Sequence, residues 1–187
     1  MMIRYILSII GLLIIFSCSK KANLTTSDNT PKAEHIQPKP LARFITNLPQ
    51  TIDFNGLDTL LFLKRSPCFG FCSAYDYTLF SNGIIRYMGY AHVDPIGEHY
   101  ALLQESVWDT IIQEAHKITF FKLANRYPEI EENFIPDLPS TFIMLKDAGE
   151  RKMIRDNHSP PKELKQLEVY IDAKLRSLTL ESKSSNR

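Results

Sequence analysis

The feature that most constrains the fold is an alternating stretch centred on Asn82-Gly83. Upstream of this pair, aromatic and apolar residues alternate with polar ones from Tyr75 to Leu79, and downstream a mostly apolar run extends from Ile84 to Tyr90. Alternation with a period of two is typical of β-strands. An Asn-Gly pair supplies the positive φ angles that a type I′ turn requires. The stretch therefore predicts a β-hairpin.

Further segments have strand patterns. Residues 59–64 read Thr-Leu-Leu-Phe-Leu-Lys, a short continuous apolar run that is typical of a strand covered on both faces. Residues 98–103 are predicted to be extended. A second hairpin is predicted from strands over 141–146 and 151–155, which flank a turn at Asp147-Ala148-Gly149-Glu150.

Two amphipathic helices are predicted after the hairpins. Ser106 is placed to cap the first helix, with Asp109 three residues later. The second helix is predicted to begin at Ser159-Pro160, with proline at its first position. The apolar residues that define one face of each helix are Val107, Trp108, Ile111, Ile112 and Ala115, then Leu164, Leu167, Ile171, Leu175 and Leu178. We therefore predict an α+β fold, an antiparallel sheet built from two hairpins with two amphipathic helices packed on one face.

The first eighteen residues predict an exported lipoprotein. Arg4 precedes a twelve-residue run, mostly apolar, from Tyr5 to Phe16, which is shorter than the roughly 20 residues of a membrane-spanning helix. Residues 1–17 have the charged start and short apolar core of a secretory signal. A small residue, Ser17, precedes Cys18, and this arrangement predicts acylation of Cys18, although Phe16 is bulkier than usual at its position. The alternative is a plain cleaved signal and a soluble periplasmic protein.

The chain after the predicted cleavage site divides into a tether and one domain. Residues 18–50 are rich in Lys, Thr, Asn, Ser and Pro and predict a lipid-anchored, mostly disordered tether, with partial order after about residue 40. Residues 55–180 suit a single domain with a sizeable core. Residues 181–187 are predicted to be a disordered tail. Because Ser19 is not aspartate, passage to the outer membrane is expected.

The charge balance argues against nucleic acid as a partner. The chain holds 22 Lys and Arg residues against 21 Asp and Glu residues, and loss of Arg4 with the signal makes the two counts equal. A nucleic-acid binder normally shows a clear basic excess or stripe. The predicted partners are therefore the membrane, through the lipid anchor, and an envelope protein or ligand.

Cys68 and Cys72 are the only cysteines left once Cys18 is acylated. Because an exported protein meets oxidising conditions, we predict a disulfide between them. The alternative is a metal-binding or thiol redox protein. A Cys-x₃-Cys pair with a distant histidine, here His158, is similar to copper-delivery proteins of thioredoxin fold, and thiolates suit Cu(I). That fold places its cysteines at the start of a helix, whereas a hairpin is predicted after Cys72.

Signatures of classical enzymes and cofactor sites are absent from the sequence. The five histidines include no pair at the spacing of a zinc-binding helix, and no two glycines lie two positions apart, as dinucleotide loops and nucleophile elbows require. Glu129, Glu131, Glu132 and Asp137 lack the ordered spacing of a calcium loop, which favours solvated charge. The sequence therefore predicts no cofactor, no metal and no catalytic residue, and it favours a role other than catalysis.

Several short motifs together resemble an uncharacterised domain family of exported bacterial lipoproteins, marked by Cys-aromatic-Gly-x-Cys-Pro-x-Tyr. The residues that carry the resemblance are Pro67, Cys68, Gly70, Cys72, Tyr75, Asn82, Gly83, Asp137 and Pro139. Ser73 stands where the family usually has proline. The resemblance covers about residues 58–176 and implies export and domain boundaries but no activity.

These observations lead to one functional hypothesis. The chain is predicted to be a lipid-anchored protein of the bacterial cell envelope whose single domain acts as a binding or interaction module.

Overall fold

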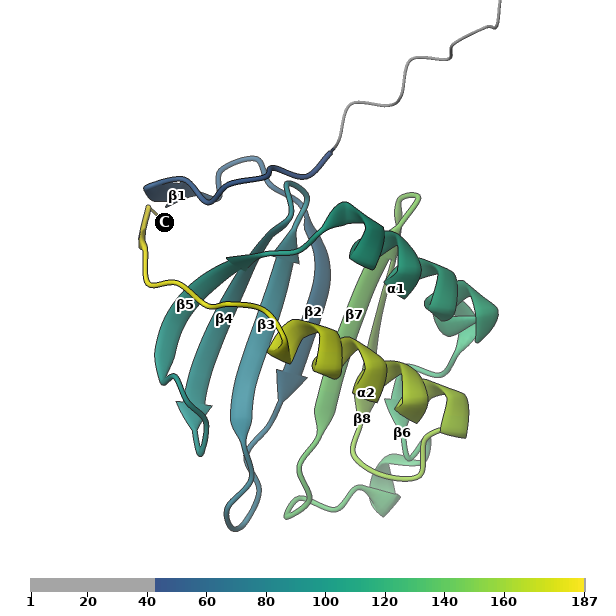
Figure 1. Cartoon of the computed structure of the whole chain (residues 1–187). Coiled ribbons are helices and arrows are strands. Elements are labelled where there is room, and N and C mark those ends of the chain that lie inside the picture. Colours follow the sequence, from purple (N-terminus) through teal and green to yellow (C-terminus); the bar gives the residue numbers. More distant parts are fainter. Residues whose placement is uncertain (1–42, 187) are drawn as a thin grey trace, which may run out of the picture. The chain divides into compact units, whose positions relative to one another are not determined.

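The computed structural model describes residues 43–186, and these form a sheet with two helices (Figure 1). The predicted signal peptide, the predicted lipidation site Cys18 and most of the predicted tether lie outside the described residues. Among residues 43–186, no helix is long and apolar enough to cross a membrane.

A seven-stranded sheet is the centre of the fold, with the strand order β5-β4-β3-β2-β7-β8-β6. All neighbouring strands run antiparallel except β6 and β8, which are parallel. The predicted α+β class is thus confirmed, with a sheet wider than two hairpins. Its strands are β2 (Thr59–Arg65), β3 (Ala74–Phe80), β4 (Ile84–Ala91), β5 (Gly97–Leu102), β6 (Arg126–Tyr127), β7 (Thr141–Asp147) and β8 (Glu150–Asp156).

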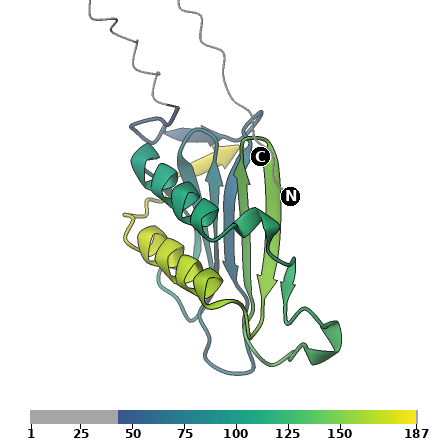
Figure 2. The same ribbon diagram turned by 90° about the vertical axis from the view of Figure 1, so that its right-hand side faces the viewer.

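The helices α1 (Glu105–Lys117) and α2 (Lys162–Arg176) lie on the same side of the sheet (Figure 2). Short 3₁₀ turns, η1 (Phe120–Lys122) and η2 (Glu131–Asn133), follow α1. Both helices bury an apolar stripe, because residues three and four positions apart share a helix face. The buried apolar residues are Trp108, Ile111 and Ala115 in α1 and Leu164, Leu167, Ile171 and Leu175 in α2.

The hairpin of β3 and β4 forms where Asn82-Gly83 predicts it, but its turn differs from the expected type I′. Gly83 has a φ of 90°, whereas Asn82 is not among the described residues with positive φ. The Gly83 amide donates to the Phe80 carbonyl over 2.9 Å, so residues 81–83 form a three-residue loop that ends in glycine. A Cβ atom on Gly83 would lie 2.7 Å from the Cβ of Phe44.

The hairpin of β7 and β8 has the turn conformation that was expected at Asn82-Gly83. Ala148 and Gly149 have φ angles of 47° and 85° and join the two strands directly. Positive φ at both central residues is the property of a type I′ turn. The turn type therefore follows from the register of each strand pair and not from the Asn-Gly dipeptide alone.

Both helices begin away from the predicted serine caps. α1 begins at Glu105 after Gln104, so Ser106 lies inside the helix, and α2 begins at Lys162 after Pro161. In the described structure neither preceding residue makes a side-chain capping hydrogen bond. A residue before proline is disfavoured in the helical region. Ser159 and Pro160 both precede a proline, and the helix therefore starts only after Pro161.

The folded unit extends beyond the predicted limits of 55 and 180. Phe44 is buried, and β1 (Thr51–Asp53) pairs in parallel with β9 (Ser184–Asn186). Partial order was expected after about residue 40, whereas residues 181–187 were expected to form a disordered tail. Glu181 and Tyr100 exchange backbone hydrogen bonds of 2.7 and 2.8 Å. The two ends of the described chain therefore pack along the β5 side of the sheet.

The first described residues lie at the opposite end of β3 from the cysteines. The Ile45 amide donates to the Asn82 carbonyl over 2.8 Å, which places this segment at the β3–β4 turn. Cys72 lies two residues before Ala74, where β3 begins. Seven residues of strand separate the two ends by about 20 Å.

Candidate functional site

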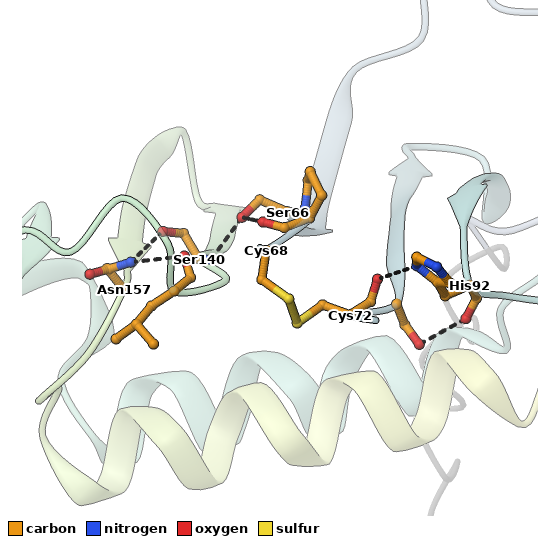
Figure 3. The surroundings of a disulfide bond; sticks show 9 residues. Ser66, Cys68, Cys72, His92, Ser140 and Asn157 are labelled. Carbon is orange, nitrogen blue, oxygen red and sulfur yellow. Dashed lines mark hydrogen bonds between the residues drawn. A yellow bond between two sulfur atoms is a disulfide. The ribbon is translucent and has the colours of Figure 1, made fainter. Parts of the chain in front are cut away.

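The candidate site is built around the loop that joins β2 to β3, residues 66–73, called here the disulfide loop (Figure 3). Cys68 and Cys72 form a disulfide with their Cα atoms 5.6 Å apart. The Gly70 amide donates to the Cys68 carbonyl over 2.9 Å, and Gly70 has a φ of 146°. Glycine is favoured there, because other residues rarely adopt this backbone conformation.

Hydrogen bonds fix both sides of the disulfide loop to neighbouring segments. On one side, the Ser66 amide donates to the Ser140 carbonyl over 2.9 Å, and the Ser140 amide donates to the Ser66 hydroxyl over 2.8 Å. On the other side, the Ser73 hydroxyl donates to the His92 carbonyl over 3.0 Å. The His92 ring nitrogen Nδ1 lies 3.2 Å from the Cys72 carbonyl (Figure 3).

Asn157 holds the segment on which the disulfide loop rests. Its buried side-chain amide donates to the carbonyls of Ile135 and Leu138 and to the Ser140 hydroxyl, over 3.2, 3.3 and 3.1 Å. Its oxygen accepts the Ile135 amide over 3.1 Å. A single side chain thus satisfies several backbone groups of residues 135–140, a role that sequence reasoning missed because Asn157 follows a strand like any loop residue.

Phe69 and Phe71 protrude from the disulfide loop, and we call them the aromatic tip. Their exposed fractions are 92% and 93%, the highest among the exposed large apolar residues of the described chain. The Phe71 ring lies 5.2 Å from the His92 ring, edge to face. A phenylalanine is usually buried, so two almost fully exposed rings on one cross-linked loop are unusual.

A group of six ionisable acidic and basic residues and one tyrosine lies beneath the disulfide loop, between the sheet and α2. We call it the ionic cluster, and it consists of Arg65, Tyr75, Asp156, Lys165, Glu168, Asp172 and Arg176. The members come from the ends of β2, β3 and β8 and from one face of α2. Sequence reasoning found only Tyr75. The spacing of the four α2 members, at positions 165, 168, 172 and 176, was the available signal, because it places them on one helix face.

Asp172 is the centre of one half of the cluster. Its Oδ1 accepts a 2.6 Å hydrogen bond from the Tyr75 hydroxyl, and its Oδ2 lies 3.5 Å from the guanidinium nitrogens of both Arg65 and Arg176. The Arg176 Nη2 donates to the Tyr75 oxygen over 2.8 Å. Burial is the main cause that raises the pKa of Tyr75, and its hydrogen bond to Asp172 adds to this effect. Tyr75 therefore stays a neutral hydrogen-bond donor.

Glu168 is the centre of the other half, and its side chain is fully buried. Lys165 donates to Glu168 over 3.1 Å and to Asp156 over 2.7 Å, while Arg65 lies 3.8 Å from Glu168. Burial, followed by the charge of Asp156, raises the pKa of Glu168 to about 7. One oxygen of Glu168 and one of Asp156 are buried without a hydrogen-bond partner in the described structure.

A cavity opens between the disulfide loop and the ionic cluster, with a volume of about 380 Å³. Its charged lining consists of Arg65, Lys165, Asp172 and Arg176, and hydroxyl groups contribute the other polar lining. The residues with hydroxyl groups are Ser73, Tyr75, Ser140 and Thr141. The arrangement can bind a polar ligand, since several donors converge on one opening.

The structure brings most of the motif residues together at this end of the sheet. Cys72, Tyr75 and Pro139 line the cavity, and Pro67, Cys68 and Gly70 belong to the disulfide loop above it. The Asp137 carbonyl accepts the Phe69 amide over 3.4 Å. Asn82 and Gly83 lie at the other end of β3, where they support the turn.

The residues of the alternative metal site are not brought together. His158 lies 2.8 Å from the Asn133 carbonyl and 3.0 Å from the Ser159 hydroxyl. Within residues 43–186, no group of three or more His, Cys, Asp or Glu side chains is arranged to hold a metal ion. Cys68 and Cys72 also lie in a loop between strands and not at a helix N-terminus.

One residue of the acidic segment considered for calcium, Glu131, is paired with arginines. Glu131 lies 2.7 Å from Arg126 and 2.8 Å from Arg155. The hydrogen bond from Arg155 is the main cause that lowers the pKa of Glu131. Its carboxylate therefore has two guanidinium partners.

An α+β domain with a disulfide loop above an ionic cavity is the class of structure that these observations define. Residues 59–175 match the model of a family described as a domain of unknown function, DUF6438, and the chain belongs to this family. The match covers the sheet from β2 onward and nearly all of α2. No curated protein matches the chain.

Proposed function

We propose that this protein is a lipid-anchored binding module of the bacterial cell envelope, which contacts its partner through the aromatic tip. The observation that carries the proposal is the exposure of Phe69 and Phe71, at 92% and 93%. Burying a phenylalanine side chain stabilises a protein by about 1.5–3 kcal/mol. Because the fold leaves both phenylalanine side chains in water, their burial against a partner would stabilise the complex by a similar amount.

The disulfide loop suits this role because it presents the two rings on a restrained backbone. The cross-link between Cys68 and Cys72 and the hydrogen bonds of Ser66 and Ser73 hold the loop at both ends. Restraining a loop before binding lowers the entropy that association costs. Aromatic residues, phenylalanine included, are also enriched in the cores of protein interfaces.

The tip lies at the end of the domain opposite to the point where the described chain begins. The first described residues pack at the β3–β4 turn, and the tip precedes the start of β3, which is its opposite end. Two or three acyl chains on Cys18 would give stable attachment, because one chain alone binds only marginally.

The proposal is tested by photo-cross-linking in intact cells. A photoreactive phenylalanine analogue replaces Phe71 in the anchored chain, and in a second strain it replaces Val169, an exposed apolar residue of α2. We expect a discrete adduct from position 71 and none from position 169. The same adducts from both positions, or none from position 71, would contradict a role for the tip.

Two further measurements test the anchor and the disulfide. Mass spectrometry of the mature protein is expected to find acylated Cys18 at its N-terminus, and Cys18→Ala is expected to release the chain from the membrane fraction. Alkylation of envelope-purified protein without reductant is expected to leave Cys68 and Cys72 unmodified. Two freely alkylated thiols would contradict the disulfide in the cell.

A further inference from the structure

Arg65 is a half-buried guanidinium with few close hydrogen-bond acceptors, and it lines the cavity beside the disulfide loop. Its side chain is 19% exposed, and it donates to the Thr141 hydroxyl. The nearest carboxylates, of Glu168 and Asp172, lie 3.8 and 3.5 Å away, so they form ion pairs without close hydrogen bonds. A guanidinium carries five N–H donors, and within residues 43–186 most of those of Arg65 have no close acceptor.

Arg176 reaches the same opening from α2. It donates through Nε and Nη2 to the Tyr75 oxygen, and its Nε lies 3.5 Å from the Asp172 Oδ2. The same Oδ2 atom lies 3.5 Å from Arg65. Two guanidinium groups thus share one carboxylate oxygen at a distance longer than a strong charge-assisted hydrogen bond. A second carboxylate between the two guanidinium groups would accept hydrogen bonds from the N–H groups that do not bond to Asp172.

The charges of the ionic cluster fit a ligand with a single negative charge. Arg65, Lys165 and Arg176 carry three positive charges, and Asp156, Glu168 and Asp172 offer three carboxylates. Full burial favours the neutral form of Glu168. Because the pKa of Glu168 is about 7, the excess positive charge of the cluster near neutral pH is at most one, which a carboxylate balances and a doubly charged phosphate exceeds.

We infer that the cavity beside the disulfide loop is a binding site for a carboxylate group, which Arg65 and Arg176 hold by charge-assisted hydrogen bonds. The hydroxyls of Ser73 and Ser140 line the same cavity and can hydrogen bond to neighbouring polar atoms of the ligand. The inference deepens the proposed function and rests on it in one respect, that the protein is a binding module. The carboxylate belongs either to the C-terminus of a peptide or to an acidic sugar.

The test is a calorimetric titration of the full chain, purified in detergent, with two matched pairs of small molecules. N-acetyl-alanyl-alanine is compared with its C-terminal amide, and glucuronate is compared with glucose. We expect saturable binding of one or both carboxylates, with a Kd of about 1 mM or tighter, and at least about tenfold weaker binding of the neutral partner. The pair that binds identifies the source of the carboxylate.

Variants then assign the binding to the cavity. Arg176→Gln removes the more exposed guanidinium and is expected to weaken carboxylate binding at least about fivefold. Arg126→Gln removes an exposed arginine that pairs with Glu131 elsewhere and is expected to leave binding unchanged. Equal binding of acid and neutral molecule, no binding of either acid, or equal loss in both variants would overturn the inference.

The result is separable from the test of the aromatic tip. Capture of a partner at Phe71 without carboxylate binding would overturn the cavity inference and leave the proposed function intact. Carboxylate binding without capture at Phe71 would support the cavity and remove the tip from the proposal.

Discussion

The hydroxyl of Tyr75 donates a 2.6 Å hydrogen bond to Asp172, a residue 97 positions later in the chain. This bond joins the start of β3, next to the disulfide loop, to the last turns of α2. Arg176 donates to the same Tyr75 oxygen. The contact therefore connects the position of the candidate site to the packing of the helix on the sheet.

We predict that Tyr75→Phe destabilises the protein by about 1–2 kcal/mol, because it leaves the half-buried Asp172 without its hydrogen-bond donor. Chemical denaturation of the full chain measures this effect. Tyr170→Phe, at a partly exposed position of α2, is the matched control and is expected to change the free energy of unfolding by less than about 0.5 kcal/mol. Equal effects of the two variants would show that the Tyr75 hydroxyl contributes nothing specific.

A second prediction concerns Gly83, at the turn between β3 and β4. Gly83→Ala is expected to destabilise the protein by more than about 1 kcal/mol, because it combines positive φ with a clash against Phe44. Gly149→Ala is the matched control, since Gly149 has a similar φ of 85° and no atom within 4 Å of an added Cβ. The difference between the two variants, from denaturation curves, measures the clash alone. No difference would mean that Phe44 moves aside freely.

Part of the fold was accessible from the sequence because it depends on local patterns. Alternation from Tyr75 to Leu79 predicts β3, and the apolar spacing from Leu164 to Leu175 predicts α2, since each pattern reflects which side chains face the core. The turn types and the first residues of the helices could not be predicted as well from the sequence. They depend on strand register and on the restriction that consecutive prolines impose before Lys162.

The candidate site could be predicted only in part for a different physical reason. Cys68 and Cys72 are close in sequence, so their pairing needs no knowledge of the fold. Arg65, Asp156 and Glu168 come from separate strands and a helix, and they meet only when the sheet order is known. The ionic cluster is therefore a product of topology, which local periodicity does not reveal.

The third prediction is a pH dependence that Glu168 confers on stability. The pKa of Glu168 is raised from 4.5 to about 7 in the folded protein, mainly by burial, so the folded state keeps a proton that the unfolded chain releases. The stabilisation that comes from this bound proton is fully present below about pH 4.5. It is lost as the pH rises to about 7, and the free energy of unfolding then falls by at most about 3 kcal/mol. Glu168→Gln removes this titration and is expected to gain stability relative to the native chain over that window.

Urea denaturation at several values between about pH 5 and pH 8 measures this difference. Glu163→Gln removes one negative charge from an exposed position of the same helix and controls for net charge. A difference between Glu168→Gln and the native chain that stays constant over this range would contradict the assignment of a buried, proton-binding Glu168.

The last prediction separates binding from stability at the aromatic tip. Phe69→Ser and Phe71→Ser, made together, are expected to change the free energy of unfolding by less than about 0.5 kcal/mol, because rings exposed by 92% and 93% lose almost no buried area. Phe120→Ala, at a fully buried position, is the contrasting variant and is expected to cost about 3–5 kcal/mol. The tip variant should nevertheless lose its partner in affinity capture from detergent-solubilised envelopes. A stable tip variant that still captures the partner would show that the rings are exposed without serving the interaction.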